Sequence, residues 1–129
     1  MQKTDKKEFA KVAWIDIPVL DLDRAQDFYS GVLKARFRPR QANIPMAVFE
    51  HMNGTQSAAL FMAENSQPSP QGAVIYWSVE GRIQDAQAKV EALGGQILRP
   101  IHEIQPFGFR AIVLDSEGNR MALHAETDQ

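Results

Sequence analysis

Asp16 and His124 are the side chains best suited, by type and placement, to acid–base chemistry. Each lies in a segment that predicts a strand, one near either end of the chain. A histidine titrates near neutral pH and acts as a general base when a carboxylate orients its ring. We therefore hypothesise that His124 is a base oriented by Asp16, provided that the fold brings them within hydrogen-bonding distance. The alternative is a surface histidine and an unrelated aspartate.

Other catalytic groups are missing from the 129-residue sequence. It has no cysteine, which excludes disulfides, thiolate metal sites and a cysteine nucleophile. It has no phosphate-binding glycine loop, dinucleotide fingerprint or nucleophile elbow. The net charge of −2 gives no reason to expect nucleic acid or an anionic membrane as a partner. The polar start and the lack of an apolar run of about 20 residues predict a cytoplasmic protein without a membrane helix.

The predicted helices and strands follow one order twice. In each half, an apolar strand precedes an amphipathic helix and three further extended segments. Asp21 stands at the N-cap position of the first helix, Asn53-Gly54 predicts a hairpin, and Gly94-Gly95 end the second helix. The predicted strands span residues 11–19, 36–40, 46–52, 56–62, 73–79, 96–99, 109–114 and 120–125, and the predicted helices span 22–33 and 83–93.

The repeat predicts two related modules. Shifting the second half back by about 60 residues aligns Ile15 with Ile75 and Leu33 with Leu93, as expected of paired units that complete each other's core. The first module spans about residues 9–63 and the second about residues 72–126, joined by a polar loop over residues 64–72. The fold class is α+β, built from two βαβββ modules in a single domain.

Three stretches resemble the vicinal oxygen chelate superfamily, which includes glyoxalases, bleomycin resistance proteins and extradiol dioxygenases. Residues 19–33 (VLDLDRAQDFYSGVL) resemble its first-helix signature, and residues 90–95 (VEALGG) resemble the end of its second helix. Residues 114–119 (LDSEGN) resemble its final hairpin, with Ser116 in place of the usual proline. The resemblance spans nearly the whole chain and implies two modules around an open, barrel-like cavity, although this fold serves many chemistries.

Metal-dependent members of that superfamily bind a divalent cation with His or Glu side chains on four strands. The resemblance places these positions at Trp14, Ala59, Val74 and Ala122, none of which ligates a metal through its side chain. We therefore expect no metal and no other cofactor. A displaced metal site made of Asp16 and His124, with Glu50 or His51 as a third ligand, is the alternative that the sequence disfavours.

Side chains alternate along a strand, so residues two positions from the expected ligands share the cavity face. The resulting ligand-binding candidates are Trp14, Asp16, Phe61, Tyr76, Ser78 and His124, of which Trp14, Phe61 and Tyr76 form an aromatic wall for an apolar ligand or simply fill the cavity. Residues 102–109 resemble the loop that closes over the cavity in this superfamily. Phe107 is then a lid residue with Gly108 as its hinge, or a packed side chain of a connecting loop.

The leading functional hypothesis is a glyoxalase-like protein that binds a small organic molecule between its modules without the usual metal. Two alternatives stay open. One is a metal-dependent lyase, isomerase or dioxygenase with displaced ligands, and the other is an interaction module with no catalytic role. The resemblance also implies that the chain forms a homodimer.

Overall fold

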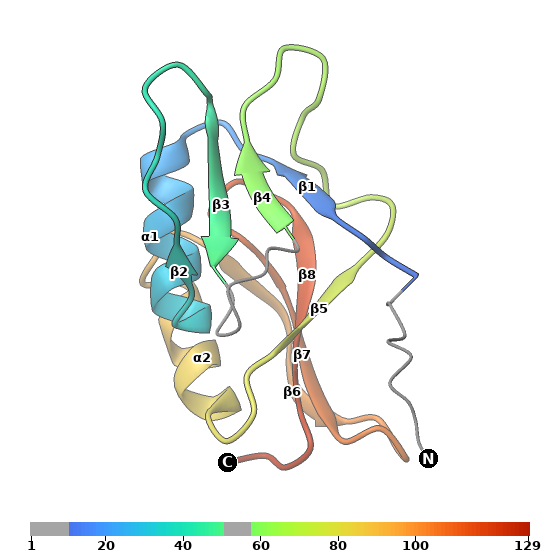
Figure 1. The fold of residues 1–129 in the computed structure, drawn as a ribbon. Coiled ribbons are helices and arrows are strands. Elements are labelled where there is room, and N and C mark those ends of the chain that lie inside the picture. Colours follow the sequence, from blue (N-terminus) through green and yellow to red (C-terminus); the bar gives the residue numbers. More distant parts are fainter. Residues whose placement is uncertain (1–10, 51–57) are drawn as a thin grey trace, which may run out of the picture.

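The computed structural model describes residues 11–50 and 58–129, and there the chain forms one βαβββ module followed by a second. The predicted α+β class with two such modules is confirmed (Figure 1). The first module contains β1 (Ile15–Pro18), α1 (Leu22–Leu33), β2 (Arg36–Phe37), β3 (Met46–Glu50) and β4 (Ala58–Phe61). The second contains β5 (Ile75–Ser78), α2 (Ile83–Val90), β6 (Gln96–Glu103), β7 (Phe109–Leu114) and β8 (Arg120–Ala125).

Each module forms a four-stranded sheet of the same topology, in the orders β1-β4-β3-β2 and β5-β8-β7-β6. The first strand of each module runs parallel to the last, and the other neighbours are antiparallel. The registers also correspond, because Ile15 is aligned with Ala58 in the first sheet and Ile75 with Met121 in the second. The predicted alignment of Ile15 with Ile75 is therefore confirmed, and β1 and β5 are edge strands that do not close the two sheets into a barrel.

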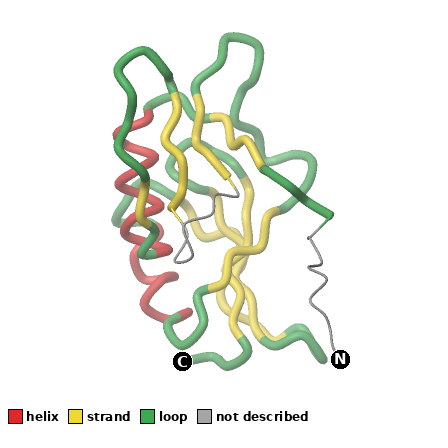
Figure 2. The backbone as a smooth tube through the Cα atoms, viewed as in Figure 1, coloured by secondary structure: helices red, strands yellow, loops and turns green. Residues whose placement is uncertain are grey.

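Both helices lie on one side of the sheets, so each sheet keeps one face without a helix, which we call its open face (Figures 1 and 2). The apolar core lies between the helices and the covered faces. Trp77 belongs to it: its ring stacks on Phe49 at a centroid distance of 5.2 Å and meets the ring of Tyr29 at 5.8 Å. The prediction that Trp77 faces the helices is confirmed.

The ends and neighbours of the helices follow from a few local residues. Asp21 caps α1 as predicted, its carboxylate accepting the Arg24 backbone N–H at 3.0 Å. Gly31 lies inside α1, and a Cβ added there would come 2.2 Å from Leu93 Cδ1. This glycine therefore allows close approach of the residues that follow α2, which offsets its poor helix propensity.

Several strands differ in length from the sequence prediction. β6 extends to Glu103 rather than ending at Arg99, with register shifts on both sides of Arg99. Its extension comes from pairing with β7, a long-range contact that local propensity does not report. β2 has only two residues, and α2 ends at Val90, before Leu93. The Asn53-Gly54 hairpin and His51 lie outside the described residues.

A turn of the second module, residues 115–119, joins the two modules. The carboxylate of Asp115, which is 2% exposed, accepts hydrogen bonds from Tyr29 Oη at 2.5 Å and Asn119 Nδ2 at 3.1 Å. Asn119 Nδ2 also donates to the Pro18 carbonyl at 2.9 Å. Burial above all, and the negative charge of Asp115, raise the pKa of Tyr29 well above 10, so its hydroxyl stays a donor.

Glu117 provides the charged half of this junction. Its carboxylate accepts the backbone N–H groups of Leu20 and Asp21 at 2.8 and 3.0 Å. Arg24 adds an ion pair of 2.8 Å to the same carboxylate. Burial opposes ionisation of Glu117, but hydrogen bonds from Arg24, the backbone and Ser116 outweigh it and lower its pKa from 4.5 to about 2.

In residues 11–50 and 58–129, no helix has the length and apolar character needed to cross a membrane.

Gly95→Ala should destabilise the protein by about 1–3 kcal/mol, because a new methyl group in a packed core forces its neighbours apart. The added Cβ would lie 2.4 Å from the Leu114 carbonyl oxygen and 2.7 Å from Phe28 Cε1. Urea unfolding measures the change. The neighbouring exposed position serves as a control, since Gln96→Ala should alter stability by less than about 0.5 kcal/mol.

Acid should weaken the junction between the modules. Because the pKa of Glu117 is lowered from 4.5 to about 2, its stabilising effect is complete above pH 4.5 and is lost as the pH falls towards 2. Glu117→Gln should cost about 1.5–3 kcal/mol at pH 7, the usual value of hydrogen bonds to a charged group. It should also flatten the pH dependence of stability between pH 5 and 2, as measured by urea unfolding across that range. An unchanged slope would contradict this role.

Candidate functional site

A cleft of about 670 Å³ lies between the edge strands β1 and β5. The segment 67–74 that links the modules forms part of its wall, and Asn119 and Arg120 of the second module complete it. Asp16 and Tyr76 face this cleft from its two sides, so the structure brings these two predicted site residues together. The cleft lies between the edge strands of the two modules, and of the ligand-binding residues predicted from the sequence only Asp16 and Tyr76 line it.

Asp16 lies on β1 and is bound to the indole that precedes that strand. Trp14 Nε1 donates to Asp16 Oδ1 at 2.7 Å, and the Trp14 side chain is 42% exposed. The carboxylate thus holds an exposed aromatic ring next to β1, although Trp14 does not itself line the cleft. Asp16 is aligned with Ala59 in the sheet, one of the positions considered for a metal ligand.

Tyr76 lies on β5 and begins a chain of polar contacts across the open face of the second sheet. Its hydroxyl, on a residue 48% exposed, accepts a hydrogen bond from Arg110 Nη1 at 2.6 Å. Arg110 Nε donates to His102 Nε2 at 3.0 Å, and His102 Nδ1 contacts the Pro100 carbonyl at 2.8 Å. Because a carbonyl only accepts, His102 carries its proton on Nδ1 and offers the Nε2 lone pair to Arg110.

His124 lies on β8 and is held by the loop before β7. Its Nε2 donates to the Phe107 carbonyl at 2.5 Å, and its ring lies 6.4 Å from that of Tyr76. Ser78 is aligned with His124 in the sheet, while the Phe107 ring is 68% exposed. His124 and Asp16 are therefore each hydrogen-bonded to a different group and not to one another.

Phe61 lies at the end of β4, aligned with Pro18 on one side and Met46 on the other. It is half-buried and does not line the cleft. Of the aromatic wall proposed from the sequence, only Tyr76 lines the cleft itself.

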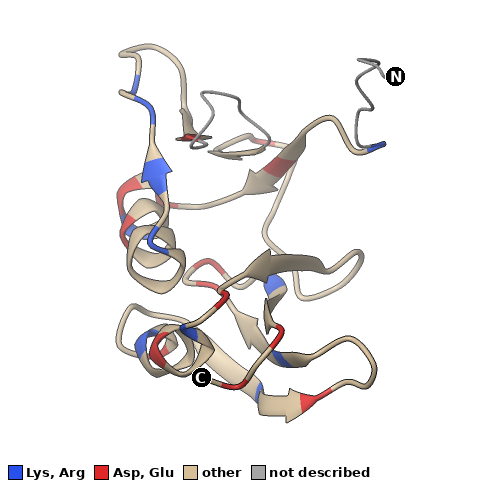
Figure 3. Cartoon of the chain, turned by 60° about the horizontal axis from the view of Figure 1, so that its bottom comes forward, with Lys and Arg blue, Asp and Glu red and all other residues tan. Residues whose placement is uncertain are grey.

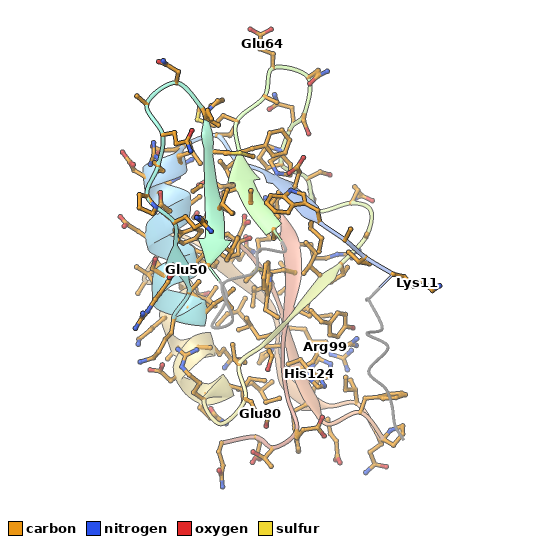
Figure 4. The ribbon with its side chains drawn as sticks, viewed as in Figure 1. Lys11, Glu50, Glu64, Glu80, Arg99 and His124 are labelled. Atoms are coloured by element: carbon orange, nitrogen blue, oxygen red, sulfur yellow. The ribbon has the colours of Figure 1, made fainter. Side chains whose placement is uncertain are left out.

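The open face of the second sheet carries three arginines and two histidines. Sheet alignment puts His124, Arg110 and His102 in one row across β8, β7 and β6, and Ala122, Ile112 and Arg99 in the next. Figure 4 labels Arg99 and His124, which lie on two strands of this sheet, and Lys and Arg positions recur along the strands of this module in Figure 3. We call the set the basic face; its members are Arg99, His102, Arg110, Arg120 and His124.

The residues at the four positions implied for a metal do not fit one. The only polar side-chain atom of Trp14 is its indole nitrogen, which donates a hydrogen bond to Asp16. The side chains of Val74 and Ala122 have no oxygen or nitrogen to ligate a metal. Ala59 has none either, and it is buried. Within residues 11–50 and 58–129, no three His, Asp or Glu side chains gather closely enough to hold a cation. The basic face would also repel one.

Sequence reasoning missed Arg110, His102 and Arg120. Alternation from His124 and Ala122 gives Arg120 the same face of β8, and this signal was available. Arg110 and His102 require the register of β7 and β6, which depends on pairing and on two register shifts.

Three comparisons with known proteins bear on the fold. A family model described as the Glyoxalase/Bleomycin resistance protein/Dioxygenase superfamily matches residues 11–123. A search of curated proteins found no match. A solved glyoxalase-related enzyme from Fulvimarina pelagi shares 21% identity over 91% of this chain and 88% of its own, with a TM-score of 0.70.

Two further solved structures are similar. A glyoxalase/bleomycin resistance protein from Albidiferax ferrireducens T118 has 18% identity, covers 90% of this chain and 98% of its own, and gives a TM-score of 0.71. The other is a mutant of the fosfomycin resistance protein FosX from Listeria monocytogenes, complexed with Mn(II) and 1S,2S-dihydroxypropylphosphonic acid. It shares 16% identity over 94% of this chain and 95% of its own, with a TM-score of 0.69. At these identities the likeness shows a shared fold and nothing about the ligand.

Asp16→Ala should change the fluorescence of Trp14, because the carboxylate is the acceptor of its indole N–H. The emission should move to longer wavelength as the ring becomes freer in water. Trp77 is packed in the core and should not respond. The same substitution in a Trp14→Phe background should therefore have no effect, and Asp23→Ala in the otherwise unchanged protein should have none either. An equal shift in the Trp14→Phe background would contradict the contact.

Proposed function

Because this chain belongs to the Glyoxalase/Bleomycin resistance protein/Dioxygenase superfamily, we propose that it binds a small organic molecule in the cleft between its modules without the divalent metal of metal-dependent relatives. The cleft itself carries the proposal. Its volume of about 670 Å³ lies in the range of small-molecule sites, and it combines apolar walls with a few polar groups. The charged and aromatic ones come from Asp16, Tyr76 and Arg120, and the neutral ones from Gln67, Ser69, Gln71 and Asn119.

The proposed absence of a metal rests on the side chains at the expected positions. In the FosX complex a Mn(II) ion accompanies a phosphonic acid, whereas Ala59 and Ala122 offer a metal nothing to bind. His124 Nε2 is already engaged by the Phe107 carbonyl. The groups left for a ligand are hydrogen-bond donors, an aromatic ring and one carboxylate, which suit recognition of an organic molecule.

A substitution that fills the cleft should abolish binding. Ala73 is exposed and lines the cleft, so Ala73→Phe places a benzyl group inside it. We expect saturable binding of the neutral fluorescent probe N-phenyl-1-naphthylamine to the unchanged protein, and at least about tenfold weaker binding to this variant, the effect of a loss of 1.4 kcal/mol. Ala88→Phe on the exposed side of α2 is the matched control and should bind normally. Equal binding by all three proteins would refute the cleft as the site.

The metal is tested separately by metal analysis and by melting the protein with Mn(II), Ni(II) or Zn(II). A cation that binds the native state at 100 times its dissociation constant stabilises it by about 2.7 kcal/mol. We expect neither stoichiometric metal nor a saturable rise in Tm. A rise that His124→Ala abolishes would overturn the metal-free proposal and favour a displaced metal site.

A further inference from the structure

We infer that the ligand of this cleft is an organic anion, whose carboxylate or phosphoryl oxygens extend past Tyr76 and Arg120, which line the cleft, to Arg110 on the adjoining basic face. This inference rests on the proposed function and specifies the chemistry of the ligand. It starts from an arginine that the fold fixes in place without neutralising its charge.

Arg110 is oriented by two neutral groups, Tyr76 Oη and His102 Nε2. None of the ion pairs among the described residues includes it. A guanidinium has five N–H donors, and these two contacts use only two of them. The remaining donors keep the planar fork geometry that matches a carboxylate or a phosphoryl group.

Both hydrogen-bond partners of Arg110 are uncharged, so neither neutralises the guanidinium as a bound anion would. His102 is fixed as the neutral tautomer, because its Nδ1 donates to the Pro100 carbonyl and its Nε2 accepts from Arg110. The Tyr76 hydroxyl accepts from Arg110, so its own proton remains available to a further acceptor. An oxyanion beside Arg110 would receive donors from both the guanidinium and the phenol.

The rest of the open face adds positive charge and no carboxylate. The residues of β5 to β8 on this face are Tyr76, Ser78, Gln96, Arg99, His102, Arg110, Ile112, Leu114, Arg120, Ala122 and His124. Arg120 lies where this face meets the cleft, and its Nη2 donates to the Gly72 carbonyl at 3.4 Å.

One carboxylate faces the site from the other module. Asp16 lines the opposite wall of the cleft and is bound to Trp14. Its negative charge disfavours an anionic group on that side, so the ligand should place its charged end against the second sheet. The apolar end would then lie towards Val12 and Ile15 on the side of β1.

Ala122 forms the floor of this arrangement. It lies on β8 between Tyr76 and Ile112, fully buried although it faces the open side. The resemblance places a metal ligand at this position, and the guanidinium groups of the same sheet face would supply positive charge to a bound anion without a metal.

The test is calorimetric titration of the whole chain with benzoate, phenylphosphonate and neutral benzamide. We expect the two anions to bind saturably and benzamide to bind at least about tenfold more weakly. Arg110→Gln should weaken anion binding by at least about tenfold, the lower end for hydrogen bonds to a charged group. Arg38→Gln, an exposed arginine on the first module, is the matched control and should have no effect. Tighter binding of benzoate or of phenylphosphonate identifies a planar or a tetrahedral oxyanion.

Two results would overturn the inference. One is equal binding of benzamide and benzoate with no effect of Arg110→Gln, and the other is no saturable binding of either anion by a folded protein, checked by its Tm. Neither result bears on the proposal that the cleft binds a small molecule. That proposal is tested with N-phenyl-1-naphthylamine, which carries no charge and does not need Arg110. Persistent binding of that probe would separate a wrong ligand class from a wrong site.

Discussion

The arrangement of the two modules depends on buried carboxylates in the turn at residues 115–119. Asp115 and Glu117 accept hydrogen bonds from the first module, through Tyr29 and through the backbone at Leu20 and Asp21. Buried charges are costly when a partner is missing and specific when every partner is present. The turn therefore favours one relative placement of the modules, with Asn119 bound to the Pro18 carbonyl at the end of β1.

That placement determines where a ligand can bind. The helices and the core lie on the covered side of the sheets. On the other side, the turn at residues 115–119 sets the separation of β1 and β5. No strand pairing closes the gap between them, and the resulting cleft borders the open face of the second sheet. Tyr76 belongs to both, because it lines the cleft and binds Arg110. The turn at residues 115–119 thus fixes the placement of the modules, and that placement forms the cleft.

The sequence predicted the features that local patterns determine. β7 and β8 have the predicted bounds, and Asp21 caps α1, because alternation and capping act over a few residues. The role of the 115–119 turn was not predictable in this way, since Tyr29 is 86 residues from Asp115 and Pro18 is 101 from Asn119. The Arg110–His102 contact likewise depends on the irregular pairing of β6 with β7. Features set by local residue patterns were predicted, whereas contacts that depend on the pairing of distant strands were not.

The difference between a guanidinium and a metal bears on what such a site can do. A divalent cation concentrates its charge on one centre and polarises a bound oxygen as a Lewis acid. A guanidinium spreads a single charge over a plane and directs its N–H groups at an oxyanion. Arg110, held by His102 and Tyr76, is therefore suited to orienting an anion rather than to activating a carbonyl. His124 lies outside the cleft on the adjoining sheet face, where the Phe107 carbonyl engages its Nε2 and leaves Nδ1 as the remaining basic atom of its ring.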